Sequence, residues 1–128
     1  MHTINGDVTI DGAGGPITLT PFEVNHGSIE ALGFRIGDLA YLPDVAQIPD
    51  DVWPLLEGLE CWILDALRRT PHPTHSHLEQ SLDWIARVAP RRAVLTNMHI
   101  DLDYQTVDDE TPAHVTPAYD GMILTYPA

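Results

Sequence analysis

Three polar residues whose side chains can bind metal ions directly follow predicted apolar strands. They are His26 after residues 22–24, Asp44 after residues 39–42, and His99 after residues 93–95. Ligands and catalytic groups gather at strand ends because the sheet holds them rigidly. Histidine and aspartate are ligands of zinc, manganese and iron. A turn, a cap or a backbone-bonded histidine would explain each residue singly, so the hypothesis of a metal site depends on all three occurring together.

A second group of candidate residues is a histidine cluster, His72, His75 and His77, in the loop and first turn of a predicted helix. The N-terminus of a helix attracts anions, so a phosphate group could dock among these side chains. The alternative explanation is a solvent-exposed loop in which one or two of the histidines have no role. We take the cluster as a candidate substrate-binding segment and as a weak metal signal.

The strands that would position these residues begin with two predicted hairpins. Residues 7–10 and 16–24 are joined by a glycine-rich turn, and residues 32–36 and 39–42 are joined by Gly37-Asp38. In the second strand the alternation of apolar residues changes phase at Pro21, which predicts a bulge or a strand end there.

The rest of the chain alternates helices and strands. The predicted elements are a short helix at 49–56, a strand at 62–64, a helix at 76–88, a strand at 93–95, and one or two strands within 114–126. In the helix at 76–88, Ser76 and Glu79 form a capping box, and Leu78, Leu82 and Ile85 share one face. Strands followed by alternation predict one α/β (α+β) domain over residues 1–128, with a mixed sheet and helices on one face.

Composition and charge disfavour some classes of binding partner. The net charge is −13 and the six basic residues are all arginine, so nonspecific binding to nucleic acid is disfavoured. The longest apolar stretch is too short to cross a bilayer, so no membrane partner is expected. One cysteine, Cys61, permits no intrachain disulfide, and no signal peptide is visible. The expected location is the cytoplasm.

The motifs resemble those of a known superfamily. The strings Val24-Asn25-His26-Gly27, Leu32-Gly33-Phe34-Arg35-Ile36 and Tyr41-Leu42-Pro43-Asp44 resemble the third and fourth motifs of the metallo-β-lactamase superfamily. Asp65-Ala66-Leu67-Arg68, His72-Pro73-Thr74-His75 and residues 93–101 resemble its later landmarks, in the right order. The subgroup that they resemble most is the phosphoribosyl cyclic-phosphate phosphodiesterases. The resemblance implies one βα half of the superfamily's αβ/βα sandwich.

The resemblance also implies roles for individual residues. His26 matches a ligand of the first metal, Asp44 the aspartate that bridges both metals, and His99 a ligand of the second metal. His75 matches a histidine that contacts the substrate phosphate or assists the leaving group. Asp65 is then a candidate for orienting a ligand histidine. The implied cofactors are two divalent ions, zinc, manganese or iron, of which this chain would supply part of the site.

Two departures from the family pattern qualify the functional prediction. Asn97 stands where many relatives have a histidine, and the His-x-His-x-Asp-His motif of the N-terminal half is absent. We therefore expect the C-terminal half of a metal-dependent hydrolase, a phosphodiesterase acting on a small cyclic phosphate or similar diester, and weak or inactive alone. The alternatives are a non-catalytic truncated assembly or metal-binding module, and a thioester or lactam hydrolase of the same fold.

The sheet face opposite the helices has no predicted cover within the chain. A contiguous exposed apolar face is rarely left bare in a soluble protein. We therefore expect a homodimer, or pairing with a missing N-terminal half.

Overall fold

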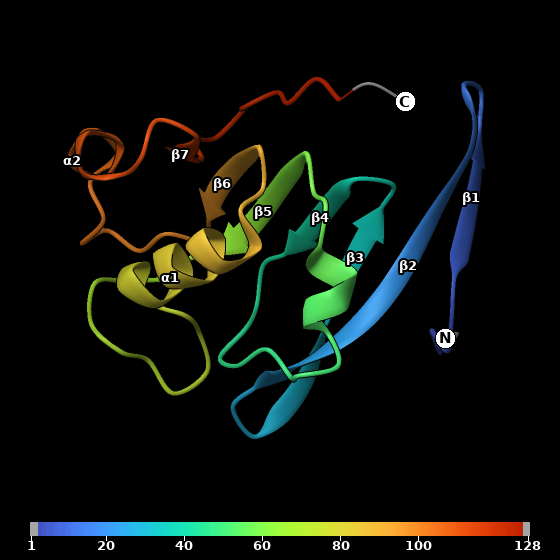
Figure 1. Cartoon of the computed structure of the whole chain (residues 1–128), viewed down its shortest axis with the longest axis horizontal. Helices are drawn as coiled ribbons and strands as arrows, with labels where there is room; N and C mark the ends of the chain where they lie inside the picture. The colour runs from blue at the N-terminus through green and yellow to red at the C-terminus, as the bar shows by residue number, and fades with distance from the viewer. Residues whose placement is uncertain (1–2, 127–128) are drawn as a thin grey trace.

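The computed structural model describes residues 3–126, which form one seven-stranded sheet with helices against one face (Figure 1). The strands lie side by side in chain order: β1 (Val8–Gly12), β2 (Gly15–His26), β3 (Ile29–Ile36), β4 (Leu39–Leu42), β5 (Cys61–Asp65), β6 (Arg92–Thr96) and β7 (Val115–Pro117). The helices are α1 (Leu78–Val88), α2 (Tyr104–Glu110) and the 3-10 helix η1 (Trp53–Leu56). The predicted fold class, a mixed sheet with helices on one face, is confirmed.

Both predicted hairpins are present, and the phase change at Pro21 has a structural cause. The predicted bulge or strand end is wrong, because strand β2 runs through Pro21 in regular register. It pairs with β1 through Leu19 and with β3 from Thr20 onwards. The apolar alternation shifts where the strand exchanges one neighbour for the other. In the β1–β2 hairpin Ile10 lies opposite Ile17, and both are more than half exposed.

The direction of the strands decides where the candidate residues meet. Strands β2 and β4 are both antiparallel to β3, and β4, β5, β6 and β7 are mutually parallel. The carboxyl ends of β2, β4, β5 and β6 therefore share one edge of the sheet. His26 is the last residue of β2, and Asp44 follows β4 by two residues.

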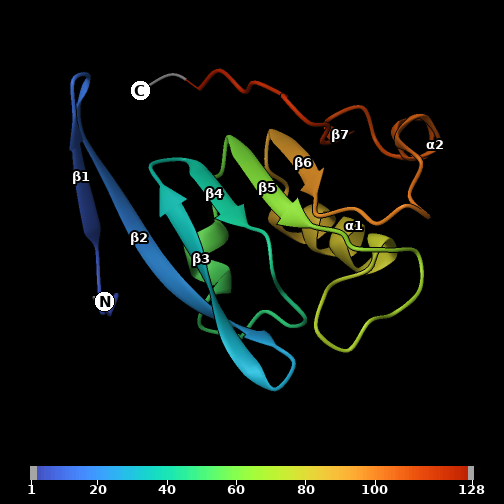
Figure 2. The same ribbon diagram turned by 180° about the vertical axis from the view of Figure 1, so that it is seen from behind.

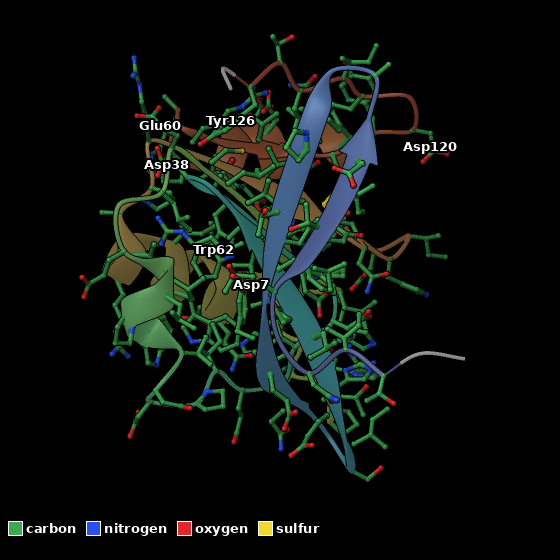
Figure 3. All side chains as sticks on the ribbon, turned by 90° about the vertical axis from the view of Figure 1, so that its right-hand side faces the viewer. Asp7, Asp38, Glu60, Trp62, Asp120 and Tyr126 are labelled. Atoms are coloured by element: carbon green, nitrogen blue, oxygen red, sulfur yellow. The ribbon has the colours of Figure 1, made fainter. Side chains whose placement is uncertain are left out.

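The hydrophobic core lies between the sheet and its helices. Figure 2 shows the sheet from the face opposite α1 and η1, and Figure 3 shows Trp62 on the helix side of the strands. The largest fully buried apolar side chains are Trp62, Leu42, Leu56, Leu64, Ile85 and Leu95. Trp62 and Leu64 thus belong to this core and not to the uncovered face of the sheet.

Helix α1 confirms the predicted apolar face but not the predicted cap. Leu78 and Ile85 are buried and Leu82 is partly buried against the core. The helix begins at Leu78 with His77 as its N-cap, and no side chain caps it. The capping box is wrong because the buried Ser76 hydroxyl donates instead to the backbone carbonyl of Asp65, at 2.8 Å.

Two other segments differ from the prediction. The helix expected at 49–56 is a 3-10 helix over Trp53–Leu56, and Pro54 lies at its start. Helix α2 was not predicted; it is short, and Asp103 caps it by accepting from the Thr106 backbone N–H at 3.0 Å. Among residues 3–126, no helix combines the length and apolar character required to cross a bilayer.

Candidate metal centre

Three side chains from separate elements come together at the carboxyl edge of the sheet. His26 ends β2, Asp44 lies beyond β4, and His75 lies in the loop between β5 and α1. One ligand atom from each residue lies within 4.8 Å of those of the other two. The imidazole rings of His26 and His75 are in edge-to-face contact, with 4.6 Å between their centroids. The site therefore gathers residues separated by almost fifty positions in the sequence.

The His26 ring is held by the backbone of the loop that carries His75. Its Nδ1 is hydrogen-bonded to the carbonyl oxygen of Thr74. Because a carbonyl oxygen accepts, Nδ1 carries the proton and Nε2 is left as the free ring nitrogen. Gly27 allows the close approach of the loop, since its φ is +79° and a Cβ there would lie 2.5 Å from Cγ2 of Thr74.

The His75 ring is held by a buried carboxylate at the end of β5. Its Nδ1 lies 2.8 Å from Oδ2 of Asp65, a side chain with no exposed surface. Asp65 also accepts from the backbone N–H of Val45 at 3.2 Å and from Nδ2 of Asn97 at 3.3 Å. Burial raises the pKa of Asp65, and the hydrogen bond from His75 is the largest effect that opposes this rise.

These contacts suit a divalent metal ion. Histidines that ligate metals usually donate one ring N–H to a carbonyl or carboxylate, which aims the other nitrogen at the ion. His26 and His75 both use Nδ1 in this way. Asp44 is half-exposed, with its Oδ1 3.9 Å from Nδ1 of His75. Imidazole and carboxylate groups are both zinc donors, so His26 and Asp44 can hold an ion with His75 beside it.

The remaining predicted residues lie around this group. His72 is next to His75, with 5.4 Å between ring centroids, and its Nδ1 is within 3.3 Å of the backbone nitrogen and hydroxyl of Thr74. Partial burial and then the positive charge of Arg68 lower the pKa of His72. His77 lines a groove together with Gln47 and Gln80.

The structure places His99 outside the three-residue group. Its side chain is more than half exposed, and its Nδ1 lies 3.3 Å from Oδ1 of Asp101. Its backbone N–H donates to the carbonyl of Leu67 at 2.7 Å, which keeps it at the same edge of the sheet. Its role as a ligand of a second ion stays a prediction. His75 joins His26 and Asp44 instead, although the sequence indicated it mainly as a substrate contact.

Two residues that help to hold the site together could not be identified from residue type. Thr74 acts through its backbone carbonyl, which no side-chain pattern reveals. Asn97 was noted only as a departure from a family pattern. The feature that marks Asn97 as unusual is its backbone φ of 61°, which can be read only from a structure.

Comparisons with known proteins agree with this architecture. Residues 1–100 match the family described as the Beta-lactamase superfamily domain. The solved structure of a new diphosphatase from the PhnP family is 32% identical and superposes with a TM-score of 0.91, over 99% of this chain and 49% of that one. Zinc-bound PqqB from Methylobacterium extorquens is 20% identical with a TM-score of 0.70, over 98% and 55% of the two chains, and shows the fold alone.

A curated relative is matched over a small part of its length. The octanoyltransferase of Porphyromonas gingivalis is 29% identical over 109 residues, which are 83% of this chain and 22% of that protein. The chain thus spans about half, or less, of the relatives it matches. The family match over residues 1–100 nevertheless covers most of this chain. The chain therefore belongs to the family of beta-lactamase superfamily domains.

Proposed function

We propose that this chain supplies part of the active site of a metal-dependent hydrolase that cleaves a phosphodiester or a phosphoanhydride. The observation that carries the proposal is the group of His26, Asp44 and His75, in which both histidines direct Nε2 away from their Nδ1 partners. The name of the 32% identical solved structure, a diphosphatase, supports phosphate chemistry. A small cyclic phosphate or similar diester is the proposed substrate class.

The proposed roles follow from the contacts. His26 and Asp44 would hold the ion, which when bound would supply Lewis-acid stabilisation of charge on phosphoryl oxygens and acidify water. His75 donates a proton from Nε2 to the leaving oxygen. Asp65 holds the imidazole ring in place through Nδ1, in the way a buried carboxylate orients a catalytic histidine. His72, whose ring is beside that of His75, is the proposed contact to a phosphate oxygen.

The experiment is metal analysis of the purified chain, followed by hydrolysis of bis-(p-nitrophenyl) phosphate. His26→Ala is expected to lower zinc or manganese content sharply. His75→Ala is expected to keep the metal and lose turnover by about 100-fold or more, the usual contribution of a general acid. Loss of metal in both variants would make His75 a third ligand, and retention of metal in both would exclude this site.

A non-catalytic metal-binding module is a second candidate, favoured by the position of His99 outside the group. With one ion position assembled, we expect turnover by the isolated chain to be weak. Robust diesterase activity that disappears on chelation would favour the enzyme over the module. A thioester or lactam substrate is tested in the same assay by exchanging the diester for the corresponding chromogenic compound.

We further propose that the uncovered sheet face associates with protein, either a second copy or a further half-domain. Ile10, Ile17 and Tyr41 are between 42% and 56% exposed on the hairpin and the sheet. Burying one large apolar side chain contributes about 1.5–3 kcal/mol. Sedimentation equilibrium at tens of micromolar is expected to show a dimer, and a clean monomer would exclude self-association.

A further inference from the structure

Asn97 occupies an unusual backbone conformation directly after β6. Among the described residues outside glycine, only Ala89 and Asn97 have a positive φ, and Ala89 is the C-cap of α1. Asparagine is one of the few residues that adopts the left-handed region at low cost. Asn97 therefore forms a single left-handed turn at the end of a buried strand, at the edge that carries the candidate metal centre.

The Asn97 side chain connects two loops that carry candidate ligands. Its Nδ2 lies 3.3 Å from the backbone carbonyl of Pro43, the residue before Asp44. The same nitrogen lies 3.3 Å from Oδ1 of Asp65, which holds His75 through Oδ2. Both partners accept, so the two N–H groups of the amide must point at them. The two contacts together fix the orientation of the amide.

The hydrogen bonds of the Asp65 carboxylate are divided between its oxygens. Oδ2 accepts from the Val45 backbone N–H and from Nδ1 of His75, and Oδ1 accepts from Asn97. The 3.4 Å approach of Asn97 Nδ2 to His75 Nδ1 joins two donors and is not itself a bond. Without Asn97, Oδ1 has no other side-chain donor among the described residues.

We propose that Asn97 is a positioning residue that sets the separation of Asp44 and His75. It ties the carbonyl that precedes Asp44 to the carboxylate that orients His75, so the two loops cannot move independently. The proposal rests on the proposed function only in naming these residues as functional. Groups that orient ligands commonly change metal affinity by about 10–100-fold when they are removed.

Two substitutions separate positioning from simple charge. Asn97→Gly keeps the left-handed turn and removes the amide, and it should weaken zinc binding about tenfold. Asn97→Asp keeps the shape but replaces both donors with acceptors that face Pro43 and Asp65. An added carboxylate near a cation would strengthen binding if charge alone mattered, whereas loss of positioning weakens it. Ile100→Asp adds the same charge at a side chain that is 92% exposed, and serves as the matched control.

The experiment measures zinc affinity by chelator competition in the full chain and its variants, and the hydrogen exchange of the Val45 amide in metal-free protein. We expect both Asn97 variants to bind zinc about tenfold more weakly and to exchange the Val45 amide faster, with Ile100→Asp showing neither weaker binding nor faster exchange. Tighter binding by Asn97→Asp, or unchanged exchange in both variants, would overturn the proposal. If the unsubstituted chain binds no zinc, the proposed function fails, and the exchange measurement alone decides the role of Asn97.

Discussion

Replacing Gly27 with alanine should move the loop that holds the candidate metal centre. Gly27 has a φ of +79°, and an added Cβ would lie 2.5 Å from Cγ2 of Thr74 and 3.3 Å from the carbonyl oxygen of Pro73. The Thr74 carbonyl holds Nδ1 of His26. The substitution therefore strains the backbone and also pushes against the residue that orients a candidate ligand.

The cost can be divided between these two effects with a matched glycine. Gly121 has a φ of +83°, and nothing among the described residues lies within 4 Å of a Cβ built there. Gly121→Ala should destabilise by about 1–2 kcal/mol, the cost of a left-handed conformation for an L-residue. Gly27→Ala should cost this amount plus about 1–3 kcal/mol for overpacking against the loop.

Urea unfolding of both variants measures the difference, with metal content as a second readout. Gly27→Ala is expected to lose both stability and metal, while Gly121→Ala loses only the smaller amount of stability. Equal free energies of unfolding and equal metal content in the two variants would refute the reasoning. That result would mean that the loop moves aside without disturbing His26.

Three further perturbations test other parts of the structure. Ile85→Ala should destabilise the fold by about 2–5 kcal/mol, because the Ile85 side chain is 1% exposed. Leu82→Ala should destabilise it by less, because Leu82 is only partly buried. Urea midpoints in the reverse order would contradict the packing of α1. Gly33→Ala should destabilise the fold by about 1–3 kcal/mol, since the added Cβ would lie 2.3 Å from the Phe22 ring. An unchanged thermal unfolding temperature would show that the Phe22 ring moves aside without cost. The pKa of Asp65 is raised in the folded state, so the folded chain binds this proton more readily than the unfolded chain. The free energy of unfolding that Asp65 contributes, relative to Asp65→Asn, should therefore be largest below its ordinary pKa of 3.8. It should fall as pH rises through the higher pKa of the folded state. Urea unfolding of both proteins across this pH range checks the direction.

Much of the fold was predictable because its signals are local. The two hairpins follow from turn residues between apolar strands, and α1 follows from the spacing of Leu78 and Ile85. The common edge for His26 and Asp44 follows from strand direction once the hairpins are known. Helix α2 has a weaker signal, since it is seven residues long and only Val107 is buried.

The errors arose where tertiary contacts compete with local patterns. Ser76 has the sequence signature of a helix cap, but the carbonyl of Asp65 lies close enough to take its hydroxyl, and Ser81 donates to the same oxygen at 2.6 Å. His75 joins His26 because the Thr74 carbonyl bridges the loop to the end of β2. These contacts depend on backbone atoms of distant segments, which residue types do not identify.

The environment of Asp65 indicates that the site is built for orientation at some cost in stability. Its side chain has no exposed surface, and among residues 3–126 its only ionisable partner within 4 Å is His75. The hydration that a carboxylate loses on burial can exceed what a single hydrogen-bonded imidazole returns. Its other donors, Val45 and Asn97, are neutral. Packing therefore does not explain a carboxylate at this position, whereas fixing the His75 ring beside His26 and Asp44 does.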